Sequence, residues 1–189
     1  ALKQATISGG SATNGGGINN VGGTVTVQNS TISGNTASYF GGGIWNYTGS
    51  ILAVQNSTLS GNSGYIGGAI RSFGTATVQN STLSGNSASY YGGGIGNFGP
   101  MTVQNSTISG NSAGYHGGAG IGNYGGVTIQ NSIIGPQVAG SDCYSFASIV
   151  SGGYNIESGV SCGFTGTGDL QNQNAAALAL GALASNGGP

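Results

Sequence analysis

The sequence predicts an all-β fold, a right-handed parallel β-helix of about six coils that ends in a short capping helix. Three observations predict it. The segment Val-Gln-Asn-Ser-Thr-Ile-Ser-Gly-Asn at 27–35 returns along the chain, its copies follow at steps of 27, 24, 25 and 26 residues, and apolar and polar residues alternate within it. Such a period, built on short alternating segments, is typical of solenoids. The glutamines that mark the copies are Gln28, Gln55, Gln79, Gln104 and Gln130.

Each coil is expected to hold three short strands. The first carries Gly-Gly-Gly-Ile, as at 41–44, and the second ends in alternating valines such as Val25 and Val27. The third is Ser-Thr-Ile-Ser. Because alternate residues of a strand face opposite sides, its apolar residue points inward, and these residues are Ile32, Leu59, Leu83 and Ile108.

These strands cannot pair within a coil, because no two-residue Asn-Gly turns join them as hairpins. They are expected to pair in parallel with their own copies in the coils above and below, each coil adding a layer about 4.8 Å high. A right-handed path follows from the usual hand of crossovers between parallel strands. Equivalent side chains should then stack in columns along the solenoid.

One such column is a predicted structural asparagine ladder at the bend between the second and third strands. Asparagine tolerates left-handed backbone angles, and its amide can pair with the asparagine of the next coil. The ladder residues are Asn29, Asn56, Asn80, Asn105 and Asn131. The first four begin Asn-Ser-Thr glycosylation sequons, and Asn46 begins a fifth. We favour a buried or half-buried structural role, because glycan acceptors need exposed loops.

A second bend has a similar asparagine column, and two columns of aromatic residues accompany the repeats. The second asparagine column is Asn35, Asn62, Asn86 and Asn111, each after a glycine. One aromatic column is Tyr39, Tyr65, Tyr90 and Tyr115; the other is Tyr47, Phe73, Phe98 and Tyr124. Their presence in every coil favours packing by stacked rings, and a sugar-binding platform is the alternative.

The outward residues of the third strand predict a flat array of hydroxyl groups. The array continues from Thr6 and Ser8 through Thr31 and Ser33, Thr58 and Ser60, Thr82 and Ser84, and Thr107 and Ser109. A lattice of this kind is what an ice-binding solenoid presents. The simpler interpretation is that threonine and serine are soluble residues that suit a strand.

Residues 1–135 form the predicted repeat array, and residues 136–189 form a loop-rich closing segment. Cys143 and Cys162 lie in that segment and read as a disulfide if the chain is exported, with two free buried thiols as the alternative. Residues 172–184 are predicted to form an apolar helix that covers the lower end of the solenoid. The upper end begins mid-coil, so we expect an upstream segment or another subunit to cover it.

Composition argues against several functions. The chain has two basic and three acidic residues and a formal net charge of −1, which offers no electrostatic footprint for nucleic acid or anionic membrane. The longest apolar run, 175–184, is about half the length that a membrane span needs. No Cys/His cluster predicts a metal, and no motif predicts a cofactor.

No catalytic residue is predicted, and we expect the chain not to be an enzyme. The repeats lack acidic residues, and Asp142, Glu157 and Asp169 are scattered through the closing segment. The only histidine, His116, occupies an aromatic column, so a stacking role is favoured over that of a base. Arg71 has no carboxylate in its column.

The repeats and the closing segment together resemble secreted bacterial right-handed β-helix repeat proteins, similar to the passenger-like domains of polymorphic outer-membrane proteins. The resemblance is carried by the Gly-Gly-Gly-Ile-x-Asn and Ser-Thr-Ile-Ser-Gly-Asn units and by segments of the tail. These segments are 68–70, 142–143, 152–155, 161–163, 166–170 and 183–189. It implies the β-helix fold and an extracellular or cell-surface location, and is nonspecific for activity.

The leading expectation is therefore a non-enzymatic extracellular structural protein whose partner is itself, stacked head to tail into a filament. The first alternative is an adhesin or a module that binds glycans through its aromatic columns. The second is an ice-binding solenoid that uses the Thr-x-Ser face.

Overall fold

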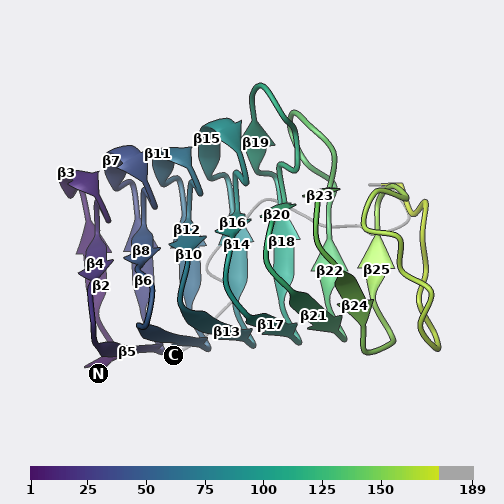
Figure 1. Ribbon diagram of the computed structural model, residues 1–189, viewed down its shortest axis with the longest axis horizontal. Coiled ribbons are helices and arrows are strands. Elements are labelled where there is room, and N and C mark those ends of the chain that lie inside the picture. The colour runs from purple at the N-terminus through teal and green to yellow at the C-terminus, as the bar shows by residue number, and fades with distance from the viewer. Residues whose placement is uncertain (175–189) are drawn as a thin grey trace.

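The computed structural model describes residues 1–174, and these form an all-β parallel solenoid of about six coils (Figure 1). The predicted fold class is confirmed to this level. The predicted C-terminal helix falls almost entirely on residues 175–184, which lie outside the described residues. No helix among residues 1–174 is long and apolar enough to cross a lipid bilayer.

Four parallel sheets run along the solenoid, and each of the first five coils contributes one strand to each of them. Sheet A contains β1 (Leu2–Lys3), β5 (Thr24–Gln28), β9 (Ile51–Gln55), β13 (Thr75–Gln79), β17 (Met101–Gln104), β21 (Val127–Gln130) and β24 (Ile149–Ser151). Sheet B contains β2 (Thr6–Ser8), β6 (Thr31–Ser33), β10 (Thr58–Ser60), β14 (Thr82–Ser84), β18 (Thr107–Ser109), β22 (Ile133–Ile134) and β25 (Ile156–Glu157).

The other two sheets complete the coil. Sheet C contains β3 (Ser11–Asn14), β7 (Thr36–Phe40), β11 (Ser63–Ile66), β15 (Ser87–Tyr91) and β19 (Ser112–Ala113). Sheet D contains β4 (Ile18–Asn20), β8 (Ile44–Asn46), β12 (Ile70–Ser72), β16 (Ile95–Asn97), β20 (Ile121–Asn123) and β23 (Cys143–Ser145). Equivalent residues of successive repeats pair in register, as Thr58 does with Thr31 and Thr82.

The prediction of three strands per coil was wrong, because sheet C is a fourth. The glycine triplets do not belong to a strand but form the corner between sheets C and D. At Gly41 the backbone has a φ of +63°, in the left-handed region that favours glycine. A Cβ at the next glycine, Gly42, would collide with the carbonyl oxygens of Ser63 and Gly68 in the neighbouring coil. The triplet thus lets adjacent coils approach at a tight corner.

The core is a column of aliphatic side chains inside the solenoid, as the alternation predicted. Val27 and Val54 from sheet A, Ile32, Leu59, Leu83 and Ile108 from sheet B, and Ile44, Ile70, Ile95 and Ile121 from sheet D have no exposed surface. Burying one such side chain contributes about 1.5–3 kcal/mol, so the repetition of the pattern holds the coils together.

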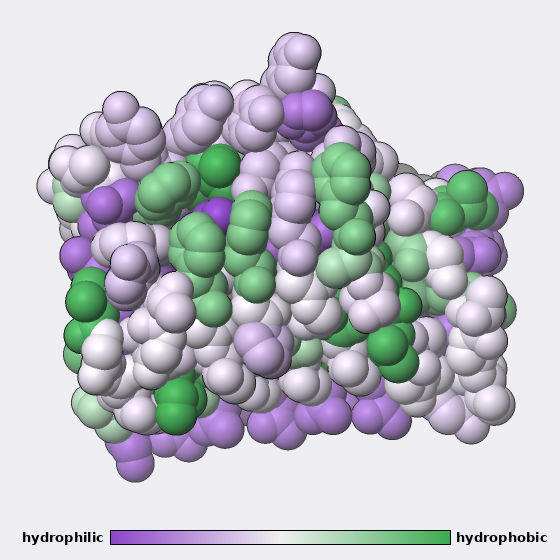
Figure 2. Space-filling view, viewed as in Figure 1, coloured by the Kyte–Doolittle hydropathy of each residue, from purple (hydrophilic) through white to green (hydrophobic). Residues whose placement is uncertain are grey.

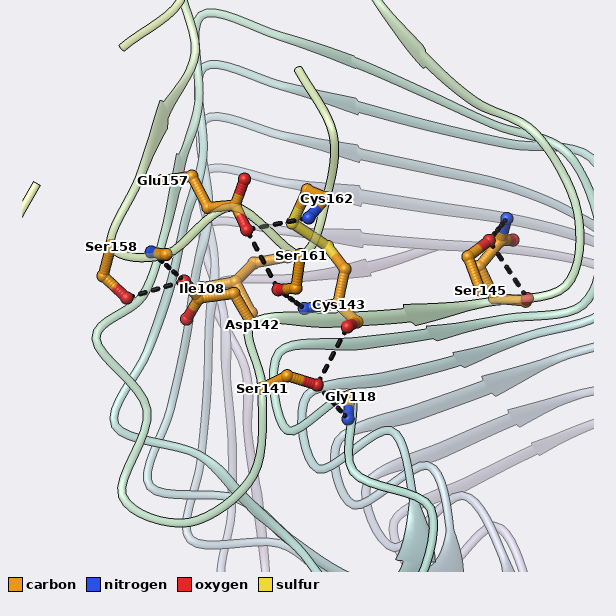
Figure 3. The surroundings of a disulfide bond; sticks show 12 residues. Ile108, Gly118, Ser141, Asp142, Cys143, Ser145, Glu157, Ser158, Ser161 and Cys162 are labelled. Carbon is orange, nitrogen blue, oxygen red and sulfur yellow. Dashed lines mark hydrogen bonds between the residues drawn. A yellow bond between two sulfur atoms is a disulfide. The ribbon is translucent and has the colours of Figure 1, made fainter. Parts of the chain in front are cut away.

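The closing segment continues the solenoid before it ends. Strands β23, β24 and β25, which lie beyond residue 135, join sheets D, A and B. The predicted disulfide is confirmed: the Sγ atoms of Cys143 and Cys162 are 2.01 Å apart. It ties the last strand of sheet D to the loop that follows β25 (Figure 3).

Candidate functional site

The interior polar residues form ladders that run from coil to coil. At the corner between sheets B and C, Asn35, Asn62, Asn86 and Asn111 are buried. The backbone N–H and the Nδ2 of Asn62 both donate to Oδ1 of Asn86, at 2.9 and 3.0 Å, and Asn86 donates in the same way to Asn111 at 3.0 Å. Gln137 accepts the last of these bonds. This column is the buried amide ladder.

A second ladder, of serines, lies at the corner between sheets A and B. The backbone N–H of Ser57 donates to Oγ of Ser81 at 3.1 Å, and Ser81 donates to Ser106 at 3.2 Å. Each serine hydroxyl in turn donates to a glutamine carbonyl two residues earlier, as Ser57 does to Gln55 at 2.6 Å. Sequence reasoning missed this ladder because serine was read as an outward residue.

The predicted asparagine ladder occupies the same corner on its outer side. Asn29, Asn56, Asn80, Asn105 and Asn131 have φ angles between 48° and 50°, so they make the expected left-handed bend. Their expected burial was wrong, since all five are exposed. Among the described residues one amide pair joins this column, from Asn80 Nδ2 to Asn56 Oδ1 at 3.1 Å. The burial argument against glycosylation therefore holds only for Asn46, which has no exposed surface.

The outer face of sheet B carries the predicted hydroxyl array. Thr31, Thr58, Thr82 and Thr107 pair in register, and so do Ser33, Ser60, Ser84 and Ser109. These side chains are half-buried, and within residues 1–174 their hydroxyls make no hydrogen bond to another side chain or to the backbone. The array is thus free to bond to solvent or to a ligand.

The aromatic columns line the outside of sheet D and its borders. Figure 2 shows hydrophobic side chains in a row that crosses the coils over this sheet. The rings of Tyr65, Tyr90 and Tyr115 stack at 5.3 and 5.8 Å with nearly parallel planes. Phe98 and Tyr124 stack at 4.7 Å, and Phe146, which the sequence analysis missed, follows at 4.9 Å. Neighbouring rings therefore pack against one another, while Tyr115 and Phe146 stay 80% and 68% exposed, so part of the ring surface remains open to a ligand.

Arg71 lies beneath these rings and not on the surface. Its guanidinium carbon is 3.7 Å from the centroid of Phe98 and 4.3 Å from that of Phe73, and its Nη1 donates to the carbonyl of Gly96 at 3.3 Å. Burial lowers its pKa to about 10. Ring quadrupoles attract the buried cation, in place of a carboxylate. The sequence predicted the column that holds Phe73 and Phe98 but not the cation between them, because only a carboxylate was considered as a partner for Arg71.

His116 has the packing role that its column suggested. Its ring lies edge-on to Tyr90 and Tyr115, each with centroids 4.7 Å apart. Its Nε2 is 2.9 Å from the Tyr90 hydroxyl, and its Nδ1 is 3.4 Å from the Tyr144 hydroxyl. Both ring nitrogens therefore have partners within the aromatic surface.

Each of the three carboxylates is held by hydrogen bonds of the closing segment, and Figure 3 shows those of Asp142 and Glu157. Glu157 is fully buried and accepts from the Cys162 N–H at 2.7 Å and from the Ser161 hydroxyl at 2.9 Å. Asp142 accepts from the Ser158 hydroxyl at 2.6 Å. These contacts give the carboxylates a role in fastening the loops around the disulfide.

Asp169 is fastened in the same way. Burial alone would raise its pKa, but hydrogen bonds from Ser151, Asn155 and Gly166 outweigh burial and hold the pKa below its ordinary value. Among residues 1–174 no group of three or more His, Cys, Asp or Glu side chains is arranged to hold a metal ion.

The chain matches no protein-family model, no curated protein and no solved structure. Of the predicted site residues, the structure brings the two cysteines together and sets the hydroxyl array in register. It places the predicted asparagine ladder on the exposed side of its corner.

Proposed function

We propose that the chain is a non-enzymatic structural protein, a stiff right-handed parallel β-helix that works outside the cell or on its surface. The observation that carries this proposal is the pair of buried ladders, which tie each coil to the next through asparagine and serine side chains. Bending the rod would break these bonds in a dry interior, where unsatisfied polar groups are costly. The right-handed path rests on the crossover rule.

Single-molecule pulling tests the structural role. We expect the unfolding force of the wild-type chain to fall clearly when Asn62 in the buried amide ladder is replaced by alanine. Replacement of the exposed Asn56 by glycine, in the same repeat, is the matched control and should leave the force nearly unchanged. Equal forces for the two variants would remove the proposed basis of stiffness.

Two observations support a location outside the cell. The buried disulfide fits maturation in an oxidising compartment, since cytosolic thiols are usually kept reduced. The resemblance to secreted bacterial β-helix repeat proteins points the same way. Immunogold labelling of the source cells should place the protein at or beyond the cell surface, and label confined to the cytoplasm would contradict the assignment.

The proposed partner is a second copy, stacked head to tail. The outer edges of β1, β2, β3 and β4 are unpaired within residues 1–174, and parallel strand edges attract further strands. The nearly uncharged surface adds little repulsion between copies. Electron microscopy at high protein concentration should show filaments. Monomers alone, by microscopy and by light scattering, would exclude this form of the proposal.

Ice binding is a second candidate, favoured by the free, in-register hydroxyls of sheet B. An ordered water layer needs a flat, repeating array of hydrogen-bonding groups whose bonds are not already used. Thermal hysteresis should be measurable and should be lost on replacing Thr82 with tyrosine, whereas the same change at Thr36 on sheet C should retain it. No hysteresis in the wild-type chain would eliminate this function.

A further inference from the structure

A shallow trough crosses the outer face of sheet A, over β13, β17, β21 and β24. Its volume is about 380 Å³. Residues that shape it include Thr77, Pro100, Thr102, Gly126, Thr128 and Ser148. The trough lies on a different face from the hydroxyl array of sheet B, and it takes no part in either buried ladder.

The trough has a column of free hydroxyl groups. Thr77, Thr102 and Thr128 pair in register, so their side chains repeat at the spacing of the strands, about 4.8 Å. Within residues 1–174 their hydroxyls, and that of Ser148, make no hydrogen bond to another residue. These groups are therefore available to a ligand at regular intervals along the solenoid axis.

Apolar surface accompanies the hydroxyls. The ring of Pro100 and the side chain of Val150, which is 51% exposed, line the trough beside the threonine methyl groups. At Gly126 a Cβ would meet no atom within 4 Å, so the missing side chain leaves the trough open. Phe146 is 68% exposed on the turn that leads from β23 to Ser148.

The chemistry of the lining selects among ligand classes. None of the lining residues carries an ionisable side chain, so a charged ligand would find no counter-charge. An apolar ligand would bury the hydroxyls without partners, which costs free energy for each group left without a hydrogen bond. A neutral sugar has hydroxyls to pair with the threonines and C–H faces to lie on Pro100 and Val150.

We propose that the trough binds a neutral linear oligosaccharide that lies along the solenoid axis. One sugar residue extends over a length close to the spacing between coils, so successive sugars meet successive threonines. The binding site is thus built by repetition: Thr77, Thr102 and Thr128 supply the hydrogen bonds, and the apolar lining excludes water around them. This role is independent of the structural role proposed above.

Isothermal titration calorimetry with cellohexaose, xylohexaose and laminarihexaose tests the proposal, with a hexamer of galacturonic acid as the charged comparison. We expect at least one neutral hexasaccharide to bind with a Kd below about 1 mM, and the acidic hexamer to bind at least tenfold more weakly. No binding of any neutral hexasaccharide would overturn the proposal, as would tighter binding of the acidic one.

Two variants locate the site. Gly126→Leu fills the trough, and because the site has room and its φ lies outside the left-handed region, the chain should fold normally and lose binding. Thr102→Val removes one hydroxyl and should weaken binding about fivefold. Thr107→Val on sheet B is the matched control and should bind as the wild type does. Equal losses for Thr102→Val and Thr107→Val, or full binding by Gly126→Leu, would reject the trough as the site.

Failure of this proposal is distinguishable from failure of the structural one. Gly126→Leu should retain the wild-type unfolding force and any filaments, because Gly126 makes no bond to the buried amide ladder or to the serine ladder. Equal unfolding forces for Asn62→Ala and Asn56→Gly, with sugar binding intact in the wild-type chain, would instead reject the structural role alone.

Discussion

The buried amide ladder predicts a large difference between two asparagines of the same repeat. Asn86 is buried in the ladder, and Asn80, six positions earlier, is exposed at the preceding corner. The perturbation is Asn86→Ala, with Asn80→Gly as its control. Both changes remove an amide from the 78–86 copy of the repeat. The glycine also raises the entropy of the unfolded chain, which adds to the cost of the control and not to that of the ladder variant.

The expected cost follows from the bonds that Asn86 makes. Its Oδ1 accepts from the N–H and the Nδ2 of Asn62 at 2.9 and 3.0 Å, and its Nδ2 donates to the Leu59 carbonyl at 2.9 Å. Its Nδ2 also donates to Asn111 Oδ1 at 3.0 Å. Alanine leaves these four groups without that partner, although Asn62 Nδ2 keeps its bond to the Ile32 carbonyl and Asn111 Oδ1 keeps its bond from the backbone N–H of residue 86. At about 1–3 kcal/mol for each unsatisfied group, and with some relief from entering water, we expect a loss of about 3–5 kcal/mol.

The control should cost little. Asn80 makes one exposed side-chain bond, to Asn56 at 3.1 Å, and its φ of 48° suits glycine at least as well as asparagine. We therefore expect Asn80→Gly to change the free energy of unfolding by less than about 1 kcal/mol.

Urea unfolding at equilibrium, followed by circular dichroism and by tyrosine fluorescence, measures both variants. Coincident transitions with the two probes establish that a single free energy of unfolding is meaningful for this repeat protein. A loss below about 1 kcal/mol for Asn86→Ala, or a loss no larger than that of Asn80→Gly, would refute the claim that the inner ladder stabilises the solenoid.

Three further predictions concern other parts of the molecule. Reduction and alkylation of the Cys143–Cys162 disulfide, whose cysteines are 19 residues apart, should lower the free energy of unfolding by about 2–4 kcal/mol. An unchanged unfolding transition in calorimetry would contradict this prediction. Arg71→Lys replaces the planar guanidinium between two rings and should lower the free energy of unfolding in urea by about 1–2 kcal/mol, whereas Arg71→Met should be close to neutral. A lysine variant as stable as the wild type would be evidence against the ring cage. The folded pKa of Asp169 lies below its ordinary value of 3.8, so the carboxylate stabilises the fold above that pH, and this stabilisation is lost as the pH falls through the folded pKa. Asp169→Asn should therefore reduce the fall in the free energy of unfolding at acid pH. An unchanged fall would show that the carboxylate contributes nothing there.

The fold class and most of the core could be predicted because they depend on a strict period. Ile32, Leu59, Leu83, Ile108 and Ile134 are apolar in five successive coils and have no exposed surface. The fourth strand was missed because segments such as Thr36–Phe40 place serine and tyrosine outward and only a small residue, Ala37, inward, so they lack the aliphatic alternation of the other strands. The Arg71 cage was missed because the partners of this cation are aromatic rings, Phe73 and Phe98, whose column was predicted only to pack, and no carboxylate marks the site.

The column that begins at Asn29 is exposed and the column that begins at Asn35 is buried, and the neighbouring residues in the sequence explain the difference. At each corner one residue takes a left-handed backbone and points outward, and the next residue points inward. At the first corner Asn29 has a φ of 50° and Ser30 is buried; at the second Gly34 has a φ of 62° and Asn35 is buried. An asparagine before serine therefore makes the bend, while an asparagine after glycine enters the core.

The same rule accounts for the Asn-Ser-Thr sequons. Asn56 supplies the left-handed bend, Ser57 joins the buried serine ladder through its hydroxyl, and Thr58 begins the next strand with its side chain outward. Each residue has its own structural reason, and the reasons act in every coil that carries the motif. The recurrence of the sequon is thus explained by corner geometry without any glycan, even though the asparagine itself is exposed. Selection for glycosylation would need only one accessible copy, whereas the ladder needs the serine in every coil.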